Sequence, residues 1–238
     1  MRFGISPDLY IALVARLHAV CTLTIGVFAQ AQVSPTSVEI AAYTGIHAAA
    51  ASGDVRRISD LSRNGATPDG RDGYLRTPLH VATYLRHHDA MRALVAGGAD
   101  PNALENDRYD IVTIASVAND VPTLKVALEI GCESTNITSR WDGTALIAAA
   151  HLGHAEVVRT LTLAGAPLDH VNNLGWTAVI ESIVLGDGGA RHQATLQALI
   201  AAKADINLAD RGGNTPLSLA KSREYRAMAT ALTTAGAR

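Results

Sequence analysis

The sequence predicts an all-α solenoid of six helix-turn-helix-loop repeats, and three observations lead to this prediction. Helix-start signals recur along the chain with steps of 33, 33, 34, 33 and 38 residues. Residues suited to helix ends recur on the same beat. The composition is 48% hydrophobic but only 4% aromatic, which suits thin helices that stack closely. Each repeat would bury its faces on its neighbours, so no single large core is needed.

The segment Arg76–Asn102 shows how one repeat is built. Thr77 can cap a helix with its hydroxyl, and Pro78 suits the first helical position because its missing N–H would be unsatisfied there. Gly98 suits the left-handed residue that ends the second helix. The same pattern predicts six repeat starts, at Thr44, Thr77, Asp110, Thr144, Thr177 and Thr215.

The turns and ends of the helix pairs repeat with the starts. Glycine and asparagine tolerate positive φ, and they occupy four of the six turn positions nine residues after each start. These turn positions are Gly53, Arg86, Asn119, Gly153, Gly186 and Glu224. The second helices are predicted to end at Gly65, Gly98, Gly131, Gly165, Lys203 and Gly236.

Three motifs, "TPLHVA", "TALIAAAHLGHAEVVRTLTLAGA" and "ADINLADRGGNTPLSLA", resemble the ankyrin repeat family, and the resemblance covers Tyr43–Arg238. It implies that His47 and His80 are scaffold residues whose imidazoles link neighbouring repeats. It also implies a recognition surface formed by the finger loop before each start and by the exposed side of each first helix, with a protein partner of no family-wide identity. The expected repeats are 44–76, 77–109, 110–143, 144–176, 177–214 and 215–238.

The first 31 residues do not fit the repeat and predict a cleavable signal peptide. An apolar run, Ala19–Phe28, follows Arg2 and Arg16 and precedes Ala29-Gln30-Ala31, which has the form of a cleavage site. We therefore expect an exported bacterial protein, periplasmic or secreted, that begins with a lead-in at residues 32–43 and has no membrane span after cleavage.

Charge and motifs exclude several classes of function. The formal net charge is −2, which gives no basic footprint for nucleic acid. Cys132 would be the single cysteine after cleavage and is expected to behave as a buried hydrophobic residue. Motifs of nucleophilic hydrolases, zinc peptidases and phosphate-binding loops are missing from the sequence. We expect a protein-binding module with neither catalytic activity nor a cofactor.

Aromatic residues gather on the predicted recognition face. Six of the seven that follow the signal lie on fingers or first helices, and large amphipathic rings are enriched at binding hot spots. The alternative is that they stack as a rigid ladder between fingers. The six are Tyr43, Tyr74, Tyr84, Tyr109, Trp141 and Trp176.

Three arginines accompany these rings in successive fingers. Arg76, Arg108 and Arg140 lie within two residues of an aromatic, a combination suited to recognising carboxylates and peptides. Solvated loop charges are the alternative interpretation.

Glu181 is the sharpest anomaly, because the equivalent position of every other repeat is apolar. A carboxylate in such a row needs a partner, which can be His151, a finger backbone or a bound ligand. The last case would make the patch of Trp141, His151, Trp176 and Glu181 a small-molecule or metal site. The full predicted contact set is Tyr74, Arg76, Tyr84, Arg108, Tyr109, Arg140, Trp141, His151, Trp176 and Glu181.

Two departures from the repeat carry further expectations. The fifth repeat contains an insertion, 187–191, which we interpret as a surface extension between its helices or as an added contact. The third repeat starts with Asp110 in place of threonine, which predicts a weak link that Asp110→Thr with Ile111→Pro would stabilise.

Overall fold

The computed structural model describes residues 33–238 of the chain. The predicted signal peptide, residues 1–31, lies outside the described residues. The repeats belong to a compact unit that runs from Gln32 to Arg238. No helix within residues 33–238 has the length and apolar character needed to cross a membrane.

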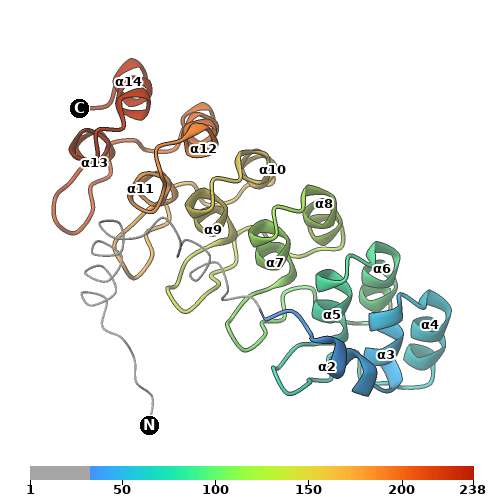
Figure 1. The fold of residues 1–238 in the computed structure, drawn as a ribbon. Coiled ribbons are helices and arrows are strands. Elements are labelled where there is room, and N and C mark those ends of the chain that lie inside the picture. Colours follow the sequence, from blue (N-terminus) through green and yellow to red (C-terminus); the bar gives the residue numbers. More distant parts are fainter. Residues whose placement is uncertain (1–32) are drawn as a thin grey trace, which may run out of the picture. The chain divides into compact units, whose positions relative to one another are not determined.

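The predicted all-α repeat architecture is confirmed (Figure 1). A short lead-in helix, α2 (Ser37–Ala42), precedes six helix pairs. The pairs are α3 (Gly45–Ser52) with α4 (Val55–Arg63), α5 (Pro78–Tyr84) with α6 (His88–Ala96), α7 (Ile111–Val117) with α8 (Val121–Glu129), α9 (Ala145–His151) with α10 (Ala155–Leu163), α11 (Ala178–Val184) with α12 (Ala190–Ala201), and α13 (Pro216–Ser222) with α14 (Arg226–Thr234).

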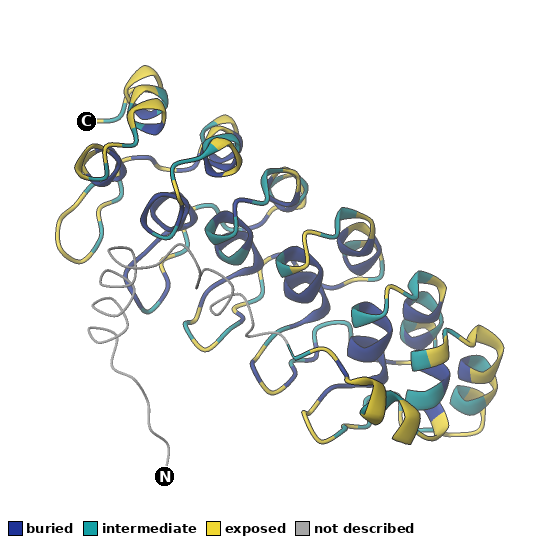
Figure 2. Cartoon of the chain, viewed as in Figure 1, coloured by how far each residue is buried: buried dark blue, intermediate teal, exposed yellow. Residues whose placement is uncertain are grey.

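Within residues 33–238 the pairs form two rows, and the loops that join successive pairs extend beyond the row of first helices (Figure 1). Each first helix packs on the first helices before and after it, and each second helix does the same in its own row. The central first helices are the most buried elements, and every residue of α11 is buried (Figure 2). Stability therefore arises mainly between neighbouring repeats.

Five of the six repeat starts cap the first helix with their side chain as predicted, and Thr44 makes no such hydrogen bond. The Thr77 hydroxyl accepts a hydrogen bond from the His80 backbone N–H, while the Thr77 N–H donates to His80 Nδ1 over 3.1 Å. The other imidazole nitrogen of His80 lies 3.2 Å from the Tyr109 carbonyl oxygen, in the next finger. Burial lowers the pKa of His80 to about 4, so the ring is neutral. His47 makes the equivalent contact with the Arg76 carbonyl oxygen at 3.2 Å, so both residues are scaffold.

The left-handed backbone positions also recur. All six predicted ends of the second helices have positive φ, including Lys203. Five of the six predicted turn positions do so as well, and Gly186 is the exception because the insertion moves the left-handed residue to Gly188. The last two residues of the insertion lie in α12, which begins at Ala190. Asp187 accepts a hydrogen bond from the Gly189 N–H and contacts His192, which closes the lengthened turn.

Asp110 has two native partners, which contradicts its interpretation as a lapse in the motif. One carboxylate oxygen accepts the Thr113 N–H over 2.7 Å and so caps α7. The other accepts from the side-chain amide of Asn136, 2.9 Å away in the following loop. Threonine at this position would leave the Asn136 contact unmade, so the stabilisation expected from the sequence does not follow.

Candidate partner-binding surface

We define a finger as the six residues before a repeat start. Fingers 2 to 6 are residues 71–76, 104–109, 138–143, 171–176 and 209–214. Each is closed by a side chain five positions before the start, which we call the hub residue. In finger 2 the hub Asp72 accepts the backbone N–H groups of Tyr74 and Arg76 over 2.8 and 2.9 Å. The same two bonds recur at every hub, namely Asp72, Glu105, Ser139, Asn172 and Asp210.

Sequence reasoning missed these hubs, although the signal was present as a hydrogen-bond acceptor at a constant offset from each start. The requirement is physical. A tight loop exposes N–H groups that the loop's own backbone cannot satisfy, and a short polar side chain supplies the acceptor.

Backbone hydrogen bonds also join the fingers to one another. The carbonyl oxygens of Tyr74, Arg108 and Trp141 each accept an N–H from the next finger, at distances of 3.1, 3.1 and 2.9 Å. The donors are Asn106, Ser139 and Asn173. Fingers 2 to 5 thus form a continuous hydrogen-bonded row that can present side chains at fixed spacing.

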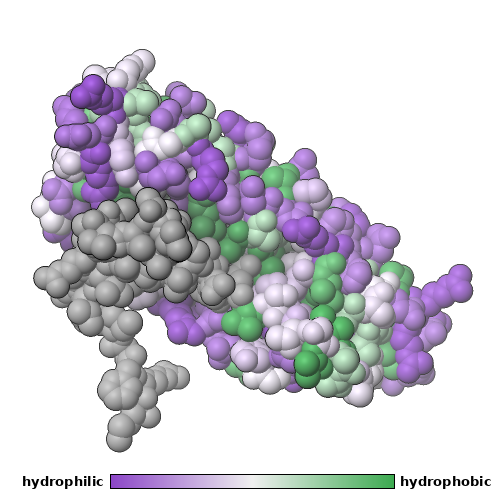
Figure 3. Space-filling model, in the orientation of Figure 1, coloured by the Kyte–Doolittle hydropathy of each residue, from purple (hydrophilic) through white to green (hydrophobic). Residues whose placement is uncertain are grey.

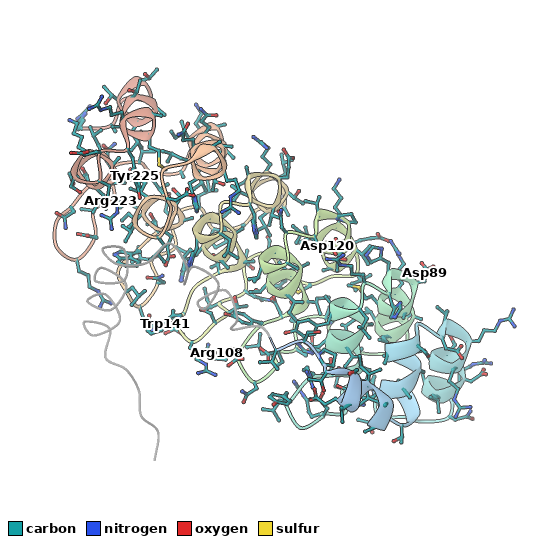
Figure 4. All side chains as sticks on the ribbon, in the orientation of Figure 1. Asp89, Arg108, Asp120, Trp141, Arg223 and Tyr225 are labelled. Carbon is teal, nitrogen blue, oxygen red and sulfur yellow. The ribbon has the colours of Figure 1, made fainter. Side chains whose placement is uncertain are left out.

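Arg108 and Arg140 lie on this row but have partners within the chain. Arg108 Nη1 is 3.0 Å from the Asp142 carboxylate, one finger further on. Arg140 pairs in the opposite sense with Asp107. Fingers 3 and 4 therefore exchange two ion pairs, and Arg108 and Trp141 lie close to the finger tips in Figure 4. The structure favours internal pairing over the predicted role of these arginines in binding a partner's carboxylates.

Arg76 was predicted to contact a partner, and the structure corrects this prediction. Its side chain is fully buried. Its guanidinium donates to Asp72, to Glu39 of α2 and to the Val33 carbonyl oxygen. The Tyr74 ring covers it, with 4.8 Å between the guanidinium carbon and the ring centroid. Arg76 therefore anchors the lead-in segment on finger 2.

The predicted aromatic contacts differ in how far they are exposed to solvent. Tyr74 is 43% exposed, and Tyr84, Tyr109 and Trp141 are partly buried. Trp176 is only 5% exposed, so it is a core residue and the structure corrects its assignment as a contact. Tyr43, which is not among the predicted contacts, donates its hydroxyl to Asp72 over 2.6 Å and belongs to the scaffold.

Glu181 is held inside the stack. Its Oε1 accepts a hydrogen bond from the side-chain amide of Asn172 over 2.8 Å, and its Oε2 lies 3.5 Å from His151 Nδ1 on α9. Asn172 is also the hub of finger 5. An aspartate there, as in fingers 2 and 6, would place two carboxylates together. The pairing of Asn172 with Glu181 favours the internal interpretation of this carboxyl group over the ligand-binding one.

Burial determines the protonation of this cluster. Loss of hydration raises the pKa of Glu181 to about 8, against a smaller lowering by the Asn172 hydrogen bond. Burial lowers the pKa of His151 to about 4, and the nearby His192 and His154 add to that lowering. Between these values the pair holds one proton, on the carboxyl group, and both side chains are neutral.

The stability of the protein should consequently fall above pH 6.5. Between pH 4.5 and 6.5 the unfolded chain carries one proton on His151 and the folded chain carries one on Glu181. In this range the pair therefore does not change the free energy of unfolding with pH. From 6.5 to 8 the unfolded chain has lost its proton while the folded chain keeps one. The free energy of unfolding then falls by about 2 kcal/mol over this range.

Urea denaturation at pH 6.5 and 8 measures this change, and Glu181→Gln is the matched control. Glutamine can still accept the Asn172 hydrogen bond but has no proton to lose, so its curve should lack the decline. An equal decline in both proteins would show that Glu181 is ionised in the folded state.

A metal site finds no support in residues 33–238. No group of three or more histidine, cysteine, aspartate or glutamate side chains in this part of the chain could hold a metal ion. Cys132 is buried, and burial raises the pKa of its thiol well above the usual value, as expected for a small core residue.

Comparisons with known proteins agree with the repeat geometry. A family model described as ankyrin repeats in three copies matches residues 112–210, and a single ankyrin repeat model matches 74–106. The chain is 31% identical to the ankyrin repeat protein YahD of Escherichia coli, over 79% of this chain and 94% of that protein. The chain belongs to the ankyrin repeat family. The repeats of ankyrin proteins generally act as non-enzymatic modules for protein–protein interaction.

Two further ankyrin repeat proteins show how the likeness extends. A crystal structure of an ankyrin repeat domain from Acinetobacter baumannii has 40% identity and a TM-score of 0.75, covering 81% of this chain and 98% of that domain. The human ankyrin repeat and SOCS box protein 16 is 29% identical over 75% of this chain, but this chain spans only 40% of its length. The likeness to the human protein therefore concerns its ankyrin repeats.

Proposed function

We propose that this ankyrin repeat protein is a non-catalytic module that binds a polypeptide partner across fingers 2 to 5 and the exposed sides of the adjoining first helices. The distribution of exposed large apolar side chains supports this face. Seven are exposed within residues 33–238, and four of them lie in or beside the fingers. These four are Tyr74, Leu75, Ile137 and Val171, while Val38, Val55 and Leu163 lie elsewhere.

Removing an aromatic side chain from this face should weaken partner binding. We expect Tyr74→Ala and Trp141→Ala each to raise the Kd about 30-fold, or ~2 kcal/mol, because aromatic anchors dominate interface energetics. The measurement is calorimetric titration with a partner isolated by affinity capture from the native extract.

Leu163→Ala is the matched control for this test. Leu163 ends α10 and is 90% exposed, so its removal takes away apolar surface outside the fingers. Its Kd should equal that of the unchanged protein. Full binding by both aromatic variants would place the recognition surface elsewhere.

Export is the second part of the proposal. The apolar run flanked by arginine and the Ala29-Gln30-Ala31 segment support a cleavable signal and a periplasmic or secreted bacterial protein. Mass spectrometry of the protein from its native source should find Gln32, or its cyclised form, at the amino terminus. An intact Met1 would replace export with a role inside the cell.

A further inference from the structure

We infer that the segment bound across fingers 2 to 5 is an uncharged, predominantly apolar polypeptide. This inference rests on the proposed function and specifies the chemistry of the partner. Three features of the described residues carry it: the charged side chains of the fingers already bond within the chain, apolar side chains are exposed beside them, and two nearby polar atoms lack a hydrogen-bond partner.

The charges of these fingers cancel. Fingers 2 to 5 contain four arginines and four acidic residues, so their formal net charge is zero. The arginines are Arg71, Arg76, Arg108 and Arg140, and the acidic residues are Asp72, Glu105, Asp107 and Asp142.

Every one of these eight groups is already engaged within the chain. Arg108 and Arg140 each form an ion pair with an aspartate of the adjacent finger. Arg76 is paired with Glu39 and Asp72. Arg71 donates to the carbonyl oxygens of Leu75 and Leu104, over 2.7 and 2.6 Å. Glu105, the hub of finger 3, accepts two backbone N–H groups.

A charged segment is therefore disfavoured on this surface. A partner's carboxylate that approached Arg108 or Arg140 would also meet the aspartate of the adjacent finger that is already paired with that arginine, and the repulsion between the two carboxylates would offset the attraction. Burying an unpaired charge costs several kcal/mol, whereas an uncharged segment leaves both ion pairs in place.

The remaining features favour apolar contact. Tyr74, Leu75 and Val171 are 43 to 50% exposed, and Ile137 lies beside finger 4 at 39%. Green apolar side chains lie among polar ones along the face turned to the viewer in Figure 3. An apolar segment would cover such side chains without displacing the ion pairs of the fingers.

Two unpartnered polar atoms suit the backbone of such a segment. Within residues 33–238, the Tyr84 hydroxyl and Asn173 Oδ1 are buried and make no hydrogen bond. Asn173 belongs to finger 5, and Tyr84 is the last residue of the first helix α5. A hydroxyl can donate to a main-chain carbonyl and an amide oxygen can accept a main-chain N–H, so neither atom requires a charged partner.

Selection from a phage library of random dodecapeptides tests the inference on the purified protein. Peptides are retained if they bind the unchanged protein and the Leu163→Ala variant but not Tyr74→Ala. We expect the retained peptides to be depleted of charged residues at their central positions. The Kd of a representative peptide should change less than about twofold between 50 and 500 mM NaCl, because no ion pair forms across the interface.

A charge placed in that peptide provides the decisive comparison. Replacing its central apolar residue with aspartate, and separately with lysine, should each raise the Kd at least tenfold. Retention of acidic or basic peptides whose affinity falls with salt would overturn the inference and leave the proposed function standing. If no peptide depends on Tyr74, the proposed function itself fails, and the inference fails with it.

Discussion

Arg76→Ala is expected to lower the free energy of unfolding by about 3–5 kcal/mol. The guanidinium is fully buried and donates to two carboxylates and one carbonyl oxygen. Its removal leaves Asp72 buried without its counter-charge and releases Glu39 and Val33 from finger 2. The loss should appear in urea denaturation, and hydrogen exchange should increase first in the lead-in helix α2.

Arg63→Ala supplies the control for this prediction. Arg63 also pairs with an aspartate, Asp60, but its side chain is 76% exposed, and a surface ion pair contributes at most about 1 kcal/mol. Arg76→Lys adds a second comparison, because lysine keeps the positive charge but cannot reproduce the three fixed donor directions. Equal stability of Arg76→Ala and Arg63→Ala would refute the role of Arg76 as an anchor.

Trp176→Ala is expected to destabilise the protein by about 3–5 kcal/mol, through the cavity that loss of a core tryptophan leaves. The sequence instead placed Trp176 in the predicted contact set. Trp176 is 5% exposed, and both its N–H and its carbonyl oxygen bond to the hub Asn172.

Trp141→Ala is the natural comparison, since Trp141 stands in the preceding finger and is less buried. It should lose less stability in the same thermal and urea denaturation measurements. A Trp176→Ala protein as stable as the unchanged one would mean that the indole does not fill the core and would return Trp176 to the contact surface.

The backbone of this protein could be predicted from sequence because its determinants are local. Thr77 and Pro78 start a helix through their own chemistry, and Gly98 ends one because of its freedom at positive φ. These signals recur about every 33 residues, so six weak local patterns reinforce one another. The capped helix starts, the helix pairs and the scaffold histidines were all accessible in this way.

The proposed binding face was less predictable, because a finger side chain can either be exposed to solvent or contact a neighbouring finger. Arg76 stands one residue before its repeat start and is buried, whereas Arg140 stands four residues before its start and its side chain is 68% exposed. Two of the groups that hold Arg76, Glu39 and Val33, come from a lead-in segment that precedes the repeats. Contacts over such separations leave no periodic signal in a single sequence.

The exchange of ion pairs between fingers 3 and 4 means that these two repeats cannot be reordered freely. Arg108 and Asp107 match Asp142 and Arg140 only while the second repeat stands directly before the third. Glu181 of the fifth repeat likewise meets His151 and Asn172, which both belong to the repeat before it. Unequal recombination that adds or removes one repeat would leave the sequence of every helix intact. It would still separate the residues that pair between neighbouring repeats. The side chains that pair between neighbouring repeats therefore fix the order of those repeats along the chain.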